Sequence, residues 1–203
     1  GRAAPPLLKA LLDKEAGVRW PSEGTAGPGV AQGLEGEFQQ VTTSGRTARL
    51  AKPGGAAVTF EISDDGRSLV LRYEGKDLGD VRVLDDALGV TDRERGSVVV
   101  PCREGLLIPA DCGAAFKHTF GTSEYEGCHM NMIGLLKQGA AMAVSWDDAY
   151  VFPELHSALV QGQPHRQRIT TALSLRRSAR AVRLTALGKG DWNTLAAGYR
   201  RIA

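Results

Sequence analysis

Short segments in which apolar and polar residues alternate dominate this chain, and clusters of turn-forming residues separate them. Between residues 37 and 187 the period is two, so Phe60 and Ile62 are predicted to face one way while their sequence neighbours face the other. Such a segment is half-buried, because successive side chains of a strand point to opposite faces of the sheet. The pattern predicts a mainly β fold, an antiparallel β-sandwich whose sheets share one apolar interior.

The sharpest local signal is the tetrapeptide Ser63-Asp64-Asp65-Gly66. Asp and Gly tolerate the positive φ angles of a tight turn, and alternation resumes directly afterwards, so a β-hairpin is predicted here. Further strands are predicted at residues 80–84, 97–100, 106–109, 140–146, 168–175 and 181–187. Few helical patterns lie between these segments, which argues against a parallel βαβ architecture.

Short helices are predicted near both ends of the chain. Close to the start, leucines recur at helical spacing after two prolines: Leu7, Leu8, Leu11 and Leu12. At the other end, Asp191 can cap a helix with one apolar face, made of Trp192, Leu195, Ala196, Tyr199 and Ile202. We expect this last helix to pack against its own domain. The chain thus divides into an N-terminal helix with a Gly/Pro-rich linker (1–36), a β-sandwich (37–190) and a C-terminal helix (191–203).

Charge and hydropathy narrow the range of partners. The 203 residues carry a net charge of only +2, and 42% of them are hydrophobic. No apolar run approaches the roughly 18 residues that span a bilayer. Six arginines fall along alternating segments, where they are predicted to form the solvated face of a sheet: Arg166, Arg168, Arg176, Arg177, Arg180 and Arg183. We therefore expect neither a nucleic acid nor a membrane as partner.

The cysteines and glycines indicate neither a metal site nor a cofactor site. Cys102, Cys112 and Cys128 lack the paired short spacing of a zinc site, and no phosphate-binding glycine loop precedes a helix. Cys102 and Cys112 flank an apolar stretch and could meet across strands as a disulfide if the protein is exported, but buried thiols fit the sequence equally well. The chain begins at Gly1 and not at Met, which fits either an added residue or a processed start from which an export signal was removed. A secreted or periplasmic location is the expectation.

One acidic pair stands out from the others as a candidate substrate site. Hydrolysis of a glycosidic bond needs two carboxyl groups across the bond, whereas adjacent residues of a strand point to opposite faces. The pairs at residues 64–65 and 85–86 are therefore predicted to serve turns. Aromatic residues flank the third pair, which favours a saccharide-binding platform made of Trp146, Asp147, Asp148 and Tyr150. The alternative, that aromatics at this strand end belong to the core, stays open.

A second candidate site lies in the stretch from residue 117 to residue 134, which is predicted to form a concave loop. A sugar mutarotase uses a histidine as general acid and a carboxylate as general base. His118, His129 and Glu124 supply these residue types as possible substrate-binding groups, although their spacing does not by itself make them converge.

Three longer segments resemble a known family of domains. They are residues 96–109 (a strand, a Gly-containing turn and a strand with a proline), residues 130–149 (a core strand followed by an acidic pair) and residues 190–201 (a terminal helix). Together they resemble the N-terminal super-sandwich, a galactose-mutarotase-like fold that precedes the catalytic (β/α) barrel in several glycoside hydrolase families. These include the endo-α-N-acetylgalactosaminidase-like and α-galactosidase-like groups.

The resemblance implies a non-catalytic accessory domain that supports a following barrel of the same polypeptide. In such enzymes the catalytic carboxylates lie on the barrel, so no catalytic residue and no cofactor are expected in this chain. The loop at residues 117–134 would then contribute to carbohydrate binding at the rim of the cleft. Two alternatives remain open: a stand-alone carbohydrate-binding module, and a small sugar mutarotase or epimerase.

Overall fold

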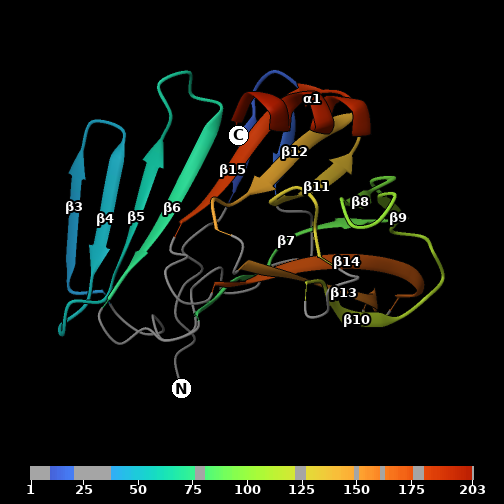
Figure 1. Ribbon diagram of the computed structural model, residues 1–203, viewed down its shortest axis with the longest axis horizontal. Helices are drawn as coiled ribbons and strands as arrows, with labels where there is room; N and C mark the ends of the chain where they lie inside the picture. Colours follow the sequence, from blue (N-terminus) through green and yellow to red (C-terminus); the bar gives the residue numbers. More distant parts are fainter. Residues whose placement is uncertain are drawn as a thin grey trace.

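Antiparallel strands make up most of the computed structural model, which describes residues 10–20, 38–75, 81–121, 127–148, 151–160, 163–175 and 181–202 (Figure 1). The larger sheet runs in the order β3 (Gln40–Ser44), β4 (Thr47–Ala51), β5 (Ala57–Ile62), β6 (Ser68–Glu74), β15 (Ala181–Lys189), β12 (Ala140–Ser145), β11 (Met132–Lys137), β8 (Ser97–Val100) and β9 (Leu106–Pro109). The smaller sheet runs in the order β10 (Phe116–Thr119), β13 (Val151–Val160), β14 (Gln163–Leu175) and β7 (Val81–Thr91). This arrangement confirms the predicted mainly β, antiparallel, sandwich-like fold.

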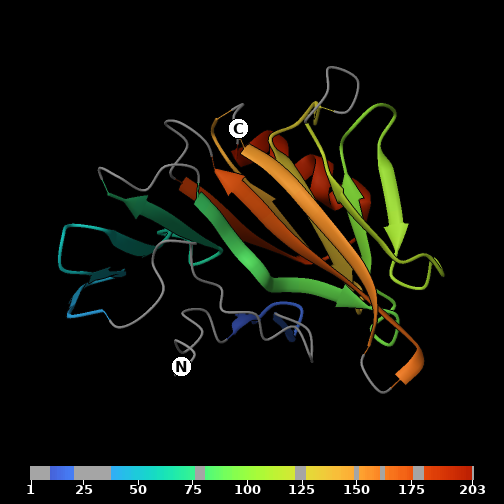
Figure 2. The ribbon, with the colours of Figure 1, turned by 90° about the horizontal axis from the view of Figure 1, so that it is seen from below.

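The two sheets differ in extent, so only part of the larger one is covered. Figures 1 and 2 show the smaller sheet lying against the part of the larger sheet that holds β11, β12 and β8, while β3, β4 and β5 project sideways as an arm. Every residue of β3 is exposed, including Val41, whose exposed fraction is 65%. The arm is thus exposed along its outer strand β3, whereas β5 at its base still contributes the fully buried Val58 to the core.

Large apolar side chains from both sheets fill the interior of the two-layered body. Members that are less than 2% exposed are Leu71, Tyr73, Leu84, Leu88, Ile133, Leu135, Met142, Leu155, Ile169 and Leu173. Inner faces of facing sheets interdigitate in this way in β-sandwiches. Burying one such aliphatic side chain contributes about 1.5–3 kcal/mol relative to leaving it in water. This layer is therefore the main source of the fold's stability.

The C-terminal helix α1 (Trp192–Ile202) covers the outer face of the larger sheet, where it contacts β11, β12 and β15. Asp191 caps it as predicted, since its Oδ1 accepts hydrogen bonds from the backbone N of Asn193 (2.9 Å) and Thr194 (3.2 Å). Leu195 is 1% exposed and packs among small residues of the sheet, which confirms that the helix docks on its own domain. Trp192 departs from the prediction, because its side chain is 55% exposed and does not belong to the buried face.

The predicted N-terminal helix is wrong within the described residues. Residues of its second half form β1 (Leu11–Asp13), which pairs antiparallel with β2 (Val18–Trp20). Asp13 sets the turn between them, because its Oδ1 accepts hydrogen bonds from the backbone N of Glu15 and Ala16, each at 3.0 Å. Trp20 is fully buried, so the segment predicted to begin a linker is anchored in the core. Leu7, Leu8 and residues 21–37 lie outside the described residues.

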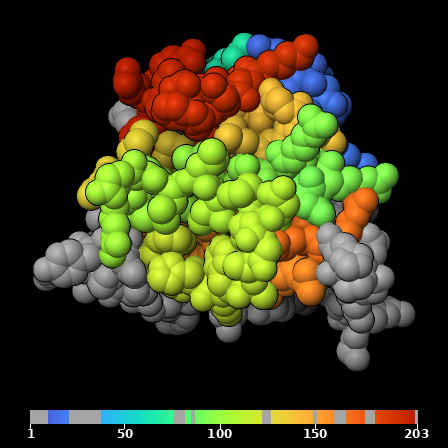
Figure 3. Space-filling model, turned by 90° about the vertical axis from the view of Figure 1, so that its right-hand side faces the viewer, coloured from blue at the N-terminus to red at the C-terminus, as the bar shows by residue number. Residues whose placement is uncertain are grey.

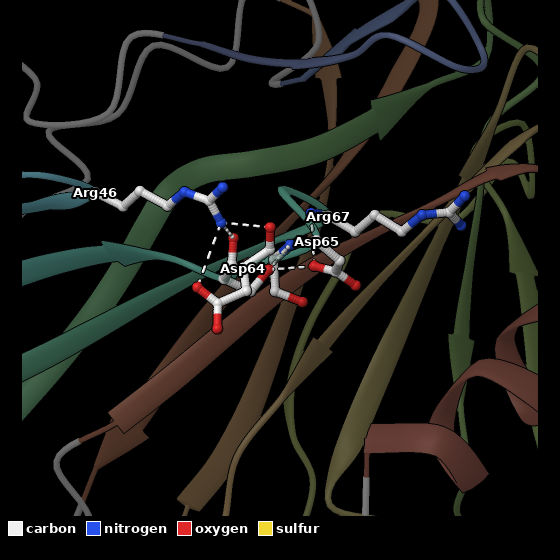
Figure 4. Close-up of polar contacts among 6 residues, drawn as sticks. Arg46, Asp64, Asp65 and Arg67 are labelled. Carbon is white, nitrogen blue, oxygen red and sulfur yellow. Dashed lines mark hydrogen bonds and ion pairs between the residues drawn. The ribbon is translucent and has the colours of Figure 1, made fainter.

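The hairpin predicted at Ser63-Asp64-Asp65-Gly66 joins β5 to β6, and Figure 4 shows its turn. Gly66 has a φ of 70°, and Asp65 Oδ1 accepts hydrogen bonds from Ser63 Oγ (2.5 Å) and from the backbone N of Arg67 (3.0 Å). These hydrogen bonds, the one from Ser63 first, hold the pKa of the Asp65 carboxyl below its ordinary value. The guanidinium of Arg46, in the turn between β3 and β4, donates to the carbonyl oxygens of Ser63 (2.9 Å) and Asp64. The acidic pair thus serves a turn, as predicted.

Residues 85–86, the second acidic pair, were predicted to serve a turn, and this is wrong. The strand predicted at residues 80–84 continues to Thr91 as β7, so Asp85 and Asp86 lie inside it. The register of β7 against β14 shifts between Thr171 and Leu173, and Leu84 adopts a φ of 55°. Both aspartates therefore lie at this register irregularity inside the strand. An irregularity of this kind is a common way for a strand to bend without ending.

Close approach of two backbones at Gly89 yields a test of the sandwich. A Cβ at this position would lie 2.5 Å from the carbonyl oxygen of Ile169 and 3.1 Å from Cα of Thr170. The backbone of β14 has to move to make room, so Gly89→Ala is expected to lower the free energy of unfolding by about 1–3 kcal/mol. Urea unfolding followed by tryptophan fluorescence measures the change.

Gly127→Ala is the matched control for this substitution, because a Cβ there meets nothing within 4 Å. We expect its unfolding midpoint to stay close to that of the unchanged chain. Equal midpoints for Gly89→Ala and Gly127→Ala would contradict the close packing of β7 on β14.

Candidate functional site

A pocket of about 400 Å³ opens where edge strands of the two sheets come together. β9 is an edge of the larger sheet and β10 is an edge of the smaller one. The lining residues come from the β8–β9 turn, the start of β9, and β10 with the residue that follows it: Cys102, Arg103, Leu106, Phe116, Lys117, His118 and Phe120. Figure 3 shows this side of the molecule, where the yellow-green atoms of the segment around residues 100–121 form much of the central surface.

The register of β10 explains how its side chains reach the pocket. His118 pairs with Leu155, which is fully buried, and Phe116 pairs with Ser157, which is 1% exposed. Partners directly opposite each other share a face of the sheet, so Phe116 and His118 point toward the interior side at the open edge. The His118 ring meets the ring of Phe120 edge to face, with centroids 4.6 Å apart and an interplanar angle of 77°. This contact fixes the half-buried imidazole in the pocket wall.

The opposite face of β10 carries an ion-pair network around Glu154. Glu154 Oε1 accepts a hydrogen bond from Arg82 Nη2 at 2.6 Å and lies 3.4 Å from Lys117 Nζ, and Oε2 accepts one from Thr119 Oγ1 at 3.3 Å. Burial by itself raises the pKa of Glu154, but the hydrogen bond and charge of Arg82, together with Lys117, outweigh it and hold the pKa below its ordinary value. The carboxylate therefore ties β10 to β13 and β7.

The pocket combines hydrogen-bond donors with apolar walls. Its lining combines the guanidinium of Arg103 and the imidazole of His118 with apolar walls from Leu106 and two phenylalanines, whereas the ammonium of Lys117, another lining residue, lies at Glu154. Arg103 adopts a φ of 51° in the tight turn between β8 and β9, where the backbone N of Gly105 donates to the carbonyl oxygen of Cys102 at 2.8 Å. A few polar groups that converge beside apolar walls are typical of small-molecule sites. Groups of this kind can donate hydrogen bonds to acceptor oxygens.

The structure brings only one of the three predicted loop residues into this pocket. His118 lies in its wall, and the stretch predicted as a loop begins with a strand, β10. His129 is exposed, and its backbone N donates to the carbonyl oxygen of Pro101 at 2.7 Å. Its side chain is not among the lining residues. Glu124 lies outside the described residues.

Trp146 does not offer a face to a sugar from solvent. Its side chain is 7% exposed and belongs to the core, and its backbone N donates to the carbonyl oxygen of Asn131 at 3.0 Å. Asp147 is exposed and Asp148 is half-buried, and neither lines the pocket. Tyr150 lies outside the described residues. The predicted platform is therefore corrected at Trp146, whose ring is used for packing.

The cysteines are arranged differently from the pairing that the sequence left open. All three lie within the described residues as thiols, and Cys102 is the direct partner of Cys128 in an isolated antiparallel bridge. Cys112 is exposed, and its sulfur accepts a hydrogen bond from Gln167 Nε2 at 3.6 Å. Among the residues that the structure describes, no three His, Cys, Asp or Glu side chains gather as metal ligands, and no helix is long and apolar enough to cross a membrane.

Several residues that line the pocket were not predicted from the sequence. Phe116, His118 and Phe120 alternate with Lys117 and Thr119, and this period-two pattern is the signal of a strand that could have placed both phenylalanines beside His118. Arg103 carried no such signal, because its place depends on how the edge of one sheet meets the edge of the other.

Comparison with known proteins shows a likeness in fold alone. No protein-family model matches the chain, and no curated protein matches its sequence. Among solved structures, the α-N-acetylgalactosaminidase NagBb from Bifidobacterium bifidum is similar in its ligand-free form (TM-score 0.57, 12% identity) and in its GalNAc complex (TM-score 0.58, 12% identity). These matches cover 80% and 95% of this chain, but only 29% and 37% of the enzyme. The chain thus spans about a third of the length of its glycoside hydrolase neighbour.

The Glu154 network yields a pH-dependent test. Glu154→Gln removes the carboxylate charge that Arg82 and Lys117 both contact, so we expect a loss of about 1–3 kcal/mol in the free energy of unfolding at pH 7. Because the folded pKa of Glu154 lies below its ordinary value, the stabilisation is complete above pH about 5 and is lost as pH falls through the folded pKa. The difference between the two proteins should therefore shrink as pH falls below about 4.

Glu61→Gln is the control, since Glu61 and Arg72 form an exposed ion pair with a 3.7 Å separation. Exposed pairs of this kind contribute little, so this variant should unfold almost as the unchanged chain does at every pH. Chemical unfolding at several pH values measures all three proteins. A Glu154→Gln deficit that is unchanged at acid pH would contradict the role given to the carboxylate.

Proposed function

We propose that this chain is a β-sandwich accessory domain of a glycoside hydrolase, whose catalytic groups lie on a separate domain of the same polypeptide. One observation carries the proposal: up to 95% of this chain superposes on only 37% of an α-N-acetylgalactosaminidase. A fold that accounts for a third of such an enzyme leaves the remainder of the enzyme to other domains. The resemblance of residues 96–109, 130–149 and 190–201 to a super-sandwich that precedes a barrel supports the same interpretation.

Exposed apolar side chains supply the surface for contact with the catalytic domain. Trp192 is 55% exposed at the start of α1, although the rest of the helix docks on the sheet through Leu195. Val41 in β3 is 65% exposed and Ile62 at the end of β5 is 47% exposed, both on the arm. Tryptophan is enriched at protein interfaces, and an edge strand presents backbone groups that a neighbour can pair. The end helix and the arm are thus the proposed supports for the neighbouring domain.

The pocket between β9 and β10 is the proposed point of contact with carbohydrate. Its imidazole and guanidinium groups can donate to sugar hydroxyl oxygens while Phe116 and Leu106 pack against the apolar face of the ring. In this role the domain encloses part of the substrate and leaves bond cleavage to the other domain. The same pocket also supports the alternative of a stand-alone carbohydrate-binding module, because all of its lining residues come from this chain.

The test compares the full product of the natural open reading frame with the isolated chain, using nitrophenyl α-N-acetylgalactosaminide and mucin-type glycans as substrates. We expect the full product to hydrolyse one of them and the isolated chain to hydrolyse neither. In the full product, His118→Ala should raise KM roughly three- to tenfold with kcat nearly unchanged, because it removes one hydrogen bond to bound sugar.

His156→Ala is the matched control, since His156 is exposed on β13 and does not line the pocket. Its kinetic constants should match those of the unchanged enzyme. A stop codon directly after Ala203, or hydrolysis by the isolated chain, would contradict the accessory role. An unchanged KM in His118→Ala would contradict carbohydrate binding in the pocket.

A further inference from the structure

Cys102 and Cys128 face each other across two antiparallel segments, immediately beside the pocket. They are direct partners in an isolated bridge, and the backbone N of His129 donates to the carbonyl oxygen of Pro101 at 2.7 Å. That hydrogen bond joins the residue after one cysteine to the residue before the other, which marks the cysteines as a non-hydrogen-bonded pair. Pairs of this kind have Cα atoms about 4.5 Å apart and bring their side chains closest, within the range that disulfides span.

The two thiols also share one environment. Cys102 is 3% exposed within the core between the sheets, and the half-buried Cys128 packs against the same cluster. Burial, and secondly the neighbouring thiol of Cys102, raise the pKa of Cys128 to about 12. Cys112 lies elsewhere, exposed and in contact with Gln167 and Ala114. The fold therefore selects one of the three possible pairs.

We propose that Cys102 and Cys128 are a disulfide-forming pair that closes when the chain folds in the presence of a disulfide oxidant such as oxidised glutathione. One cysteine thiolate attacks the glutathione disulfide and releases one glutathione thiolate, and the second cysteine then displaces the other glutathione from the mixed disulfide. The two cysteine thiols lose two protons and two electrons, and one oxidised glutathione becomes two reduced molecules. This inference depends on the bridge geometry alone and not on the proposed function.

The disulfide would close the chain segment that lines the pocket into a loop. The loop that it closes, residues 103–127, contains β9 and β10 and therefore every lining residue except Cys102 itself. Cross-linking a loop of this size restricts the unfolded chain and raises the melting temperature, here by roughly 5–10 °C. Because attack requires a thiolate and burial suppresses it in Cys128, the bond forms faster during folding than in the folded protein.

Trypsin separates the three cysteines, which makes the pairing easy to determine. Cleavage after Arg95, Arg103, Lys117 and Lys137 places Cys102, Cys112 and Cys128 on peptides 96–103, 104–117 and 118–137. The full chain is refolded from denaturant in a mixture of reduced and oxidised glutathione, alkylated, digested without reductant and analysed by mass spectrometry. We expect peptide 96–103 linked to 118–137 and an alkylated peptide 104–117. A dominant link to peptide 104–117, or alkylation of all three cysteines, would overturn the proposal.

Two variants give an independent reading through the melting temperature. Cys112→Ser should keep the rise of roughly 5–10 °C on oxidation, because it leaves the proposed pair intact. Cys128→Ser should lose the rise, and its half-buried position limits the damage to the core. If Cys128→Ser still gains stability on oxidation, or Cys112→Ser does not, the pair is assigned wrongly; the peptide map of the unchanged chain decides the matter even if a variant fails to fold.

Discussion

Burial of one face of each sheet against the other is the interaction on which the rest of this structure depends. The smaller sheet has four strands and the larger has nine, so this burial covers only part of the larger sheet. Where the edges of the two sheets meet, at β9 and β10, a pocket remains open between them. Where the larger sheet runs beyond the smaller one, β3, β4 and β5 form an arm that carries the exposed apolar residues Val41 and Ile62. The proposed binding and docking surfaces are thus both consequences of two unequal layers.

Local patterns were enough to predict the parts of the fold that local interactions decide. The turn at residues 63–66, the strands at 97–100 and 106–109 and the cap at Asp191 depend on residues close in sequence. The prediction failed where distant contacts decide the conformation. Leu11 and Leu12 have helical spacing, yet Asp13 turns the chain and its Oδ2 accepts a hydrogen bond from the backbone N of Gly188, 3.1 Å away in β15. The burial of Trp20 then favours a hairpin over a helix.

The candidate site was less predictable than the fold, because it is assembled from segments that only tertiary pairing brings together. His118 was identified from its residue type, but its partner Phe120 and the cationic Arg103 depend on how two sheet edges meet. Strand pairing also decides which cysteines are neighbours: the sequence left open a Cys102–Cys112 pair or buried thiols, and the fold sets Cys102 opposite Cys128. An aromatic at a strand end, such as Trp146, gives no sequence signal that separates packing from binding.

Amide hydrogen exchange, resolved by residue, tests the two-layered body most directly. If burial between the sheets is the main source of stability, amides of β11, β12 and β14 should exchange slowest, through global unfolding. Amides of β3, an edge strand exposed along its whole length, should exchange faster by several orders of magnitude. Protection in β3 equal to that in β12 would contradict the account, because the arm would then be as deeply packed as the body.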